Sequence, residues 1–154
     1  MLWRNSNSSL PALSFADPVA ASLTDTLLLV ARIFLGVIFV HYGYGKLLNI
    51  AGYGASFPAR GIPAWLAYVA VPIEFFGGVA LILGLATRYV AILMTVFVIV
   101  ATAISHRYWE FTDAARRGAQ EANFYKNLTM LGGFALLFVT GAGRFSLDGW
   151  LRKR

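Results

Sequence analysis

Four apolar runs, each close to the length that crosses a bilayer, constrain the fold of this chain more than any other feature. They cover residues 27–45, 64–85, 89–105 and 124–141. A helix needs roughly 20 residues to cross the hydrocarbon core. The composition agrees, since 58% of residues are hydrophobic, 13% are charged and the mean hydropathy is +0.66. We predict an all-α membrane protein, a four-helix up-down bundle with both termini on the same side.

The segments outside these runs divide the chain into three parts. Residues 1–24, rich in Ser, Ala and Pro, predict a flexible lead-in and make a poor signal peptide. Residues 25–142 form the membrane domain, in which the loop 47–63 is expected to carry a short surface helix. Residues 143–154 predict a basic juxtamembrane tail.

Several function classes are excluded by composition. The chain has no cysteine, which excludes thiolate nucleophiles, thiolate metal sites and iron–sulfur ligation. Two histidines without an acidic cluster do not predict a metal site. The net charge of +6 is scattered over loops and tail, so the expected partner is the lipid bilayer and not nucleic acid. The positive-inside rule is nearly balanced and favours cytoplasmic termini only slightly.

A charged residue lies inside the first run, where it is costly. At about 100° per residue, Arg32 shares one helix stripe with Gly36, Phe39, Gly43 and Lys46. Small residues on a stripe allow another helix to approach closely. The stripe therefore predicts a buried face that carries an arginine.

Glu74 is the one acidic residue inside any of the four runs, and Gly77 and Gly78 follow it. Neither charge is tolerable alone in hydrocarbon, so we expect Arg32 and Glu74 to form an ion pair. That pair either fixes helix register or forms part of a ligand or proton site, with Glu74 as the candidate proton carrier.

A second polar group gathers at one end of the predicted bundle. In an up-down arrangement the ends of the first and third runs meet the starts of the second and fourth. This places Lys46, His106, Lys126 and Asn127 near one mouth, above Arg32 and Glu74, as candidate binding residues. Gly132 and Gly133 in the fourth run are expected to pack against another helix.

Each of these residues also has a plainer interpretation. Lys46 and Lys126 lie at run ends, where lysines reach toward the headgroups. His106 is as consistent with an interfacial histidine as with a ligand-binding one. His41 falls opposite Arg32 on the first helix, so it is expected to face away from the mouth.

Four segments resemble those of a known family. They read ARIFLGVIFVHYGYGKL (31–47), FPARGIP (57–63), PIEFFGGVALILGLATR (72–88) and FYKNLTMLGGFALLFVTGAGRFSLD (124–148). In this order they resemble DoxX-type small membrane proteins over roughly residues 26–150. The matching positions are Arg32, Gly43, Lys46, Glu74, Gly77, Gly78, Lys126, Asn127 and Gly133.

The resemblance implies a four-helix protein of the bacterial inner membrane. The family's namesake is linked to a thiosulfate:quinone oxidoreductase, and some relatives accompany redox or detoxification enzymes. Without cysteine, this chain cannot itself hold a persulfide. The resemblance thus favours a quinone-interacting redox subunit, or an accessory of a membrane oxidoreductase, with electrons from a partner protein or a soluble substrate.

Two other functions stay open at this point. The chain could be a non-catalytic adaptor whose ion pair only fixes the bundle. It could also transport a small solute or protons, although four helices without a visible repeat are few for a transporter unless the chain forms a homo-oligomer. No motif for a bound redox cofactor is visible in the sequence, and the redox hypothesis alone expects a quinone as the ligand.

Overall fold

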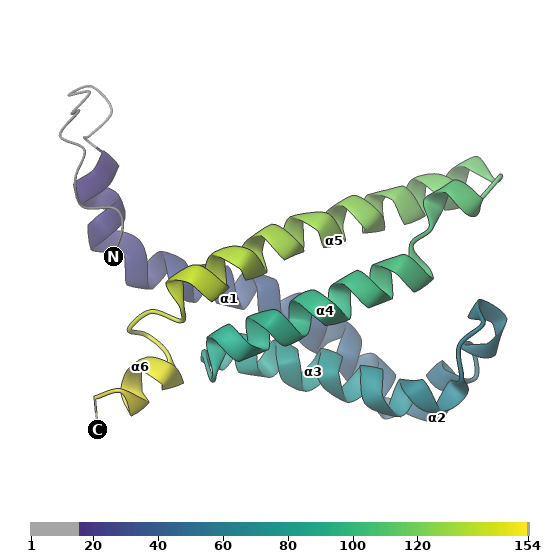
Figure 1. The fold of residues 1–154 in the computed structure, drawn as a ribbon, viewed down its shortest axis with the longest axis horizontal. Helices are drawn as coiled ribbons and strands as arrows, with labels where there is room; N and C mark the ends of the chain where they lie inside the picture. The colour runs from purple at the N-terminus through teal and green to yellow at the C-terminus, as the bar shows by residue number, and fades with distance from the viewer. Residues whose placement is uncertain (1–15, 154) are drawn as a thin grey trace.

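The computed structural model describes residues 16–153 as helices and connecting loops, without a strand. Four long helices make the bundle: α1 (Ala16–Leu48), α3 (Ala67–Leu83), α4 (Thr87–Ser105) and α5 (Ala114–Thr140). They run alternately up and down, and α6 (Leu147–Leu151) returns to the end at which α1 begins (Figure 1).

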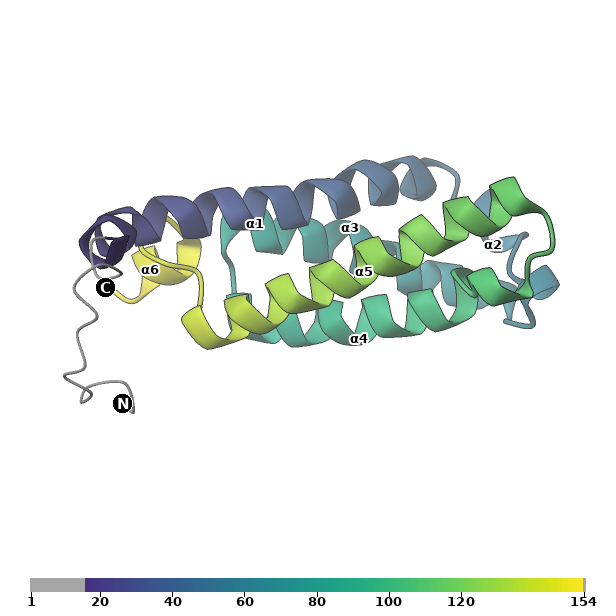
Figure 2. The ribbon, with the colours of Figure 1, turned by 90° about the horizontal axis from the view of Figure 1, so that it is seen from above.

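Short helices complete the connections. The expected surface helix in the loop 47–63 is α2 (Ile50–Gly54), which is followed by the single turns η1 (Pro58–Arg60) and η2 (Ala64–Leu66). The turn η3 (Tyr108–Glu110) lies between α4 and α5. Figure 2 shows α2 and the α4–α5 connection at the same end of the molecule, opposite α6.

The lead-in is shorter than expected. Residues 1–15 and 154 lie outside the described residues, so most of the predicted flexible segment 1–24 is not described. Residues 16–24, however, already belong to α1. The sequence did not predict this part of α1, because Ala, Leu and Val alternate there with Ser, Thr and Asp and form no apolar run.

Within residues 16–153, three helical segments are long and apolar enough to cross a membrane: Ala16–Leu48, Ala64–Leu83 and Thr87–Glu110. The expected fourth span, 124–141, lies in α5 but is not one of these three. Arg116, Arg117, Lys126 and Asn127 make the first half of that helix polar. The helical class is confirmed, whereas the crossing by α5 stays a prediction.

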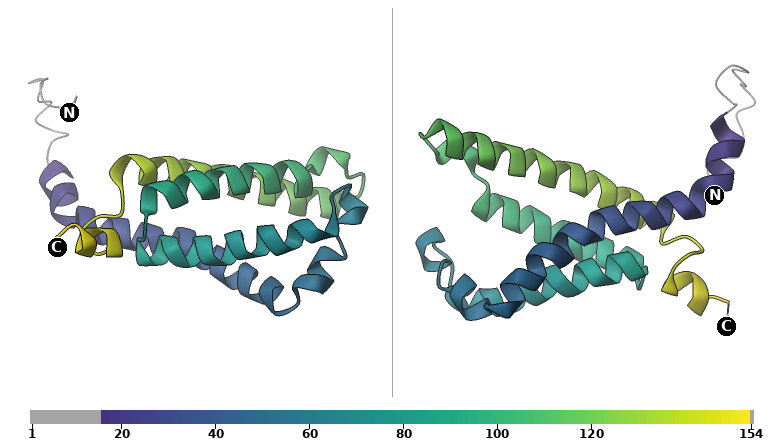
Figure 3. Two further views of the ribbon diagram at one scale, coloured as in Figure 1. Left: turned by 60° about the horizontal axis from the view of Figure 1, so that its bottom comes forward. Right: turned by 180° about the vertical axis from the view of Figure 1, so that it is seen from behind.

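The helices pair into two arms. The first arm is α1 with α3 and the second is α4 with α5, and the arms diverge toward the end that carries α2 and η3 (Figure 1, Figure 3). The buried core lies at the other end and at mid-height, where the ring centroids of Phe39 and Phe134 are 5.9 Å apart. Met94, Val98 and Leu137 pack around these rings.

Glycines let α1 and α3 approach closely. The four buried residues of α1 are Arg32, Gly36, Phe39 and Gly43, which confirms the predicted stripe. A Cβ on Gly36 would lie 2.7 Å from the carbonyl oxygen of Gly78, and one on Gly43 would lie 2.9 Å from the backbone of Phe75. Close backbone approach of this kind brings many atoms of two helices into contact in a bilayer.

Two of the three other glycines that were expected to pack against a helix lie at helix contacts. Gly77 faces the Met94 sulfur and Gly133 faces Leu35, so both lie at helix contacts as predicted. Gly132 does not, because nothing lies within 4 Å of a Cβ built on it. Within the described residues Gly132 makes no helix contact, since a neighbouring glycine at i+1 points to a different face of the helix, and its packing role stays a prediction.

Replacing Gly78 by alanine is expected to lower the free energy of unfolding by about 1–3 kcal/mol. The new Cβ would lie 2.8 Å from the Phe39 Cβ and 2.9 Å from the Gly36 carbonyl oxygen, and backbone cannot yield easily. Gly132→Ala is the matched control and should be neutral or slightly stabilising. Thermal unfolding of both variants in one mild detergent measures this, and equal losses would contradict the close α1–α3 contact.

Candidate functional site

The side chain of Arg32 lies at the end of the bundle that carries α6. Its side chain is fully buried, and its Nη1 donates to the carbonyl oxygen of Ile82 at 3.0 Å. Its Nη2 donates to the carbonyl oxygen of Phe145, in the loop before α6. The last carbonyls of a helix lack internal donors and carry the negative end of the helix dipole. Arg32 therefore ties the end of α3 to the chain that follows α5.

The expected ion pair between Arg32 and Glu74 is wrong. Because α3 runs antiparallel to α1, Arg32 meets the last turn of α3, and Glu74 lies seven residues before Leu81, or about 10 Å along the axis. Glu74 instead accepts from the ammonium of Lys46, with both carboxylate oxygens 2.7 Å from Nζ. Arg32 is not among the residues that line the cavity around Lys46 and Glu74.

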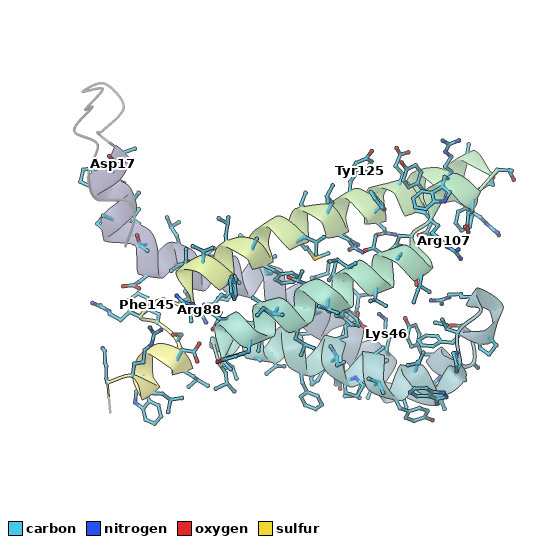
Figure 4. The ribbon with its side chains drawn as sticks, in the orientation of Figure 1. Asp17, Lys46, Arg88, Arg107, Tyr125 and Phe145 are labelled. Atoms are coloured by element: carbon cyan, nitrogen blue, oxygen red, sulfur yellow. The ribbon has the colours of Figure 1, made fainter. Side chains whose placement is uncertain are left out.

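The chain after α5 is a second capping device at the same end. Asp148 accepts hydrogen bonds from the backbone N–H groups of Ala86 (2.7 Å) and Thr87 (2.8 Å), at the start of α4. Ser146 caps α6 through Gly149, and Arg144 donates its backbone N–H to Asp25 at 2.7 Å. The segment GAGRFSLD, one basis of the resemblance, thus closes the bundle (Figure 4).

Removing this cap gives a pH-dependent loss of stability. Burial raises the pKa of the Asp148 carboxyl, but hydrogen bonds from Thr87 and Ala86 outweigh burial and hold that pKa below its ordinary 3.8. The stabilisation is therefore complete above pH about 4 and is lost as the pH falls through the folded-state pKa. Asp148→Ala should cost about 1 kcal/mol at pH 7.

Chemical denaturation of wild type and Asp148→Ala between pH 3 and pH 7 tests this cap. The two curves should converge at the acidic end. A constant difference across that range would show that the Asp148 charge does not stabilise the start of α4.

A cavity of about 910 Å³ lies between the two arms, at the end where they diverge. Its walls include Ile38, Phe39, Ile73, Phe97 and Met130. The volume falls within the range of small-molecule sites, about 300–1,000 Å³. Five of the predicted residues line it: Lys46, Glu74, His106, Lys126 and Asn127. These five residues therefore lie around one cavity, as expected, whereas Arg32 is not among the lining residues.

The polar residues of the cavity hold one another in place. Lys46 lies half-buried at this end of the bundle, with Nζ 5.0 Å from the centroid of the Tyr53 ring (Figure 4). The Asn127 amide donates to the Thr102 hydroxyl at 2.8 Å. His106 Nδ1 lies 2.7 Å from the Gln120 amide oxygen, which can only accept, so Nδ1 carries a proton. His106 Nε2 is then the ring atom left for another partner.

Several lining residues were not predicted. Arg60, Arg107 and Glu110 line the cavity from the connections between the long helices. Arg60 donates to the Ser105 hydroxyl at 3.2 Å, which links η1 to the end of α4. The position of Arg60 within FPARGIP was a usable signal, because that segment is one of the four that carry the resemblance.

Part of the cavity lining consists of exposed side chains from α3 and α4. Four of these lining residues are about half exposed: Val69, Leu93, Val96 and Val100. These side chains are apolar and belong to two of the helices that are able to span a membrane. A ligand dissolved in the bilayer could therefore reach the cavity without crossing the aqueous phase.

His41 lies away from the cavity. Its side chain is exposed, as expected from its position opposite Arg32, and it stacks edge-on against Tyr42 with ring centroids 5.1 Å apart. Among the described residues no group of three His, Asp or Glu side chains is arranged to hold a metal ion.

Comparison with known proteins connects these features to a family. The family model described as DoxX matches residues 27–107. Two relatives are the inner membrane proteins YqjF and YphA of Escherichia coli (strain K12). YqjF is 35% identical over 86% of this chain and 97% of its own length, and YphA is 38% identical over 79% and 88%.

A third relative is named for a chemical activity. The protein named "Putative oxidoreductase CatD" of Bacillus subtilis (strain 168) is 41% identical, over 46% of this chain and 53% of its own length. No solved structure gives a significant match to the chain.

Proposed function

The chain belongs to the DoxX family and is an integral protein of the bacterial inner membrane, and from this premise we propose that it binds a quinone in the cavity between its two arms. In this proposal it is a quinone-interacting redox subunit, or an accessory, of a membrane oxidoreductase system. The observation that carries the proposal is a mostly apolar cavity that is lined by exposed side chains of two helices able to span a membrane and that also contains a polar group.

A quinone has the chemistry that such a cavity would accept. Its ring and isoprenoid tail are apolar, and they would contact Phe39, Ile73 and Phe97. Its two carbonyl oxygens are hydrogen-bond acceptors, and Lys46, Lys126 and Asn127 offer N–H donors at the polar end. Sites of this kind are mostly apolar and use a few polar groups to fix orientation.

Glu74 is the proposed proton carrier. Reduction of a quinone to a hydroquinone takes up two electrons and two protons, and a carboxylate beside the ring can transfer protons. Glu74 is the acidic group at the inner, α3 side of the cavity, and Lys46 holds it in place through both oxygens. In the proposal the electrons come from a partner protein or a soluble substrate.

The proposal includes four membrane crossings. In it α5 also spans the bilayer, with Lys126 and Asn127 lining the cavity. A homo-oligomer is also expected, since large apolar side chains such as Phe34, Leu136 and Val139 remain exposed on the described helices.

Quinone carried through purification tests the proposal. The protein is purified in a mild detergent, its organic extract is assayed for quinone, and the content per chain is compared with that of Glu74→Gln. We expect near-stoichiometric quinone in the wild type and at least a tenfold loss in the variant. Because Glu74→Gln leaves the Lys46 charge unpaired, a second variant, Lys46→Met with Glu74→Met, serves as the folded control and should also lose quinone.

A non-catalytic adaptor is the second candidate, and Arg32 favours it. Within residues 16–153, Arg32 is the fully buried charged side chain; it caps α3 and serves a structural role, and the adaptor proposal extends that role to Lys46 and Glu74. No quinone in the wild type or in either variant would contradict the redox proposal and favour the adaptor.

A further inference from the structure

The charges that line the cavity do not balance. Its lining residues include four cations and two carboxylates: Lys46, Arg60, Arg107 and Lys126, with Glu74 and Glu110. Each carboxylate already has a cation. Lys46 Nζ lies 2.7 Å from Glu74, and Arg107 Nη1 lies 3.0 Å from Glu110.

Two cations are left without a carboxylate within residues 16–153. Arg60 donates to the hydroxyls of Ser105 at 3.2 Å and Ser56 at 3.0 Å, and Lys126 donates to the amide oxygen of Asn123 at 2.7 Å. These partners orient the cations but carry no negative charge. The polar end of the cavity therefore keeps a net positive charge.

A third donor at the same end lacks an acceptor. The Nε of Arg107 is buried and has no hydrogen-bond partner among the described residues, although the other end of its guanidinium reaches Glu110. A buried donor without an acceptor is unfavourable. A ligand that brings acceptor oxygens to this end of the cavity would satisfy this donor once the Arg107 side chain turns, because Nε itself has no exposed surface.

From these three observations we propose that the cavity selects an amphipathic anion: an apolar body that ends in a carboxylate or another acidic group. The acidic head would lie among Arg60, Arg107 and Lys126, and the apolar body would extend toward Ile73 and Phe97. Water is scarce beside apolar walls, so a charge there interacts more strongly than it does in solution. This inference deepens the proposed use of the cavity but does not depend on redox chemistry.

Matched photoreactive probes test the inference. The wild-type protein is placed in nanodiscs of neutral phosphatidylcholine at pH 8. It is labelled with three twelve-carbon diazirine probes that differ only in the head: a carboxylate, an alcohol and an amine. Mass spectrometry of the peptides reports labelling of cavity residues. We expect the carboxylate to label most and the amine least, with roughly tenfold between carboxylate and alcohol.

Charge-matched variants distinguish binding in the cavity from general electrostatic attraction of the carboxylate probe to the basic protein. In Arg60→Gln with Lys126→Gln, labelling by the carboxylate should fall to that of the alcohol, while the alcohol is unchanged. Arg116→Gln with Arg117→Gln removes the same charge from exposed residues outside the cavity and should leave all labelling unchanged. Comparison between variants cancels differences in how the probes partition into lipid. Equal labelling by carboxylate and alcohol in the wild type, or an unaffected double cavity variant, would overturn the inference.

Two further comparisons identify the source of the anion and test the quinone proposal separately. Nanodiscs that contain anionic phosphatidylglycerol should suppress the carboxylate probe if a lipid headgroup is the natural occupant, and should not if the occupant is a free acid. A neutral quinone would use the same apolar walls, so the two ligands are expected to compete. Charge-selective labelling of a protein that yields no quinone would support this inference and contradict the redox proposal.

Discussion

Replacing Arg32 by methionine is expected to lower the free energy of unfolding by about 3–5 kcal/mol. The substitution removes the cation that holds the carbonyl oxygens of Ile82 and Phe145, and these lie where α3 ends and α6 approaches. Hydrogen bonds from a charged donor stabilise by about 1.5–3 kcal/mol each. The new side chain also leaves these carbonyls buried without a donor.

Two further variants give this prediction its controls. Arg88→Met removes an exposed arginine that makes one bond to the carbonyl of Val139, and it should cost well under 1 kcal/mol. Combining Arg32→Met with Glu74→Gln should give additive losses, within about 0.5 kcal/mol, because the two residues share no partner. Thermal or denaturant unfolding in detergent provides the values. A coupling energy well above this value would show that Arg32 and Glu74 interact, which would contradict the structure.

Replacing Lys46 by methionine is the second large effect, an expected loss of about 3 kcal/mol. It leaves the Glu74 carboxylate unpaired at a site where its side chain is 10% exposed. The estimate is at the low end for buried pairs, because the side chain of Lys46 itself is 27% exposed. The measured quantity is again the free energy of unfolding in detergent.

The double variant Lys46→Met with Glu74→Met tests the cause. If the loss comes from an unpaired charge, replacing both partners by apolar residues should recover most of the stability. A double variant as unstable as Lys46→Met alone would show that Lys46 stabilises through packing, for instance on the Tyr53 ring. Recovery of fold with loss of ligand would separate the structural role of the pair from its proposed role in binding.

Much of the architecture could be predicted from periodicity. The stripe Arg32, Gly36, Phe39 and Gly43 follows from a 100° rotation per residue, and these are the buried residues of α1. The lengths of the apolar runs placed α3 and α4 to within a few residues. The first turns of α1 escaped prediction because helices also form where apolar residues alternate with polar ones.

The partners of the buried charges could be predicted only in part. Every backbone carbonyl is a potential acceptor, so no sequence pattern shows that Arg32 binds the end of α3. Lys46 lies on the predicted stripe, but a lysine at a run end also suits the headgroup region, and only the three-dimensional register brings it to Glu74. Arg60 and Arg107 come from loops, whose paths hydrophobic periodicity does not determine.

Blocking the cavity tests the central claim, that a ligand from the bilayer lies between the two arms. Ala101 lines the cavity, whereas Ala103, two residues along α4, is exposed and does not. Quinone carried through purification should therefore be lost in Ala101→Phe and kept in Ala103→Phe at equal stability. Equal quinone content in both variants would contradict the account and place the ligand elsewhere on the protein.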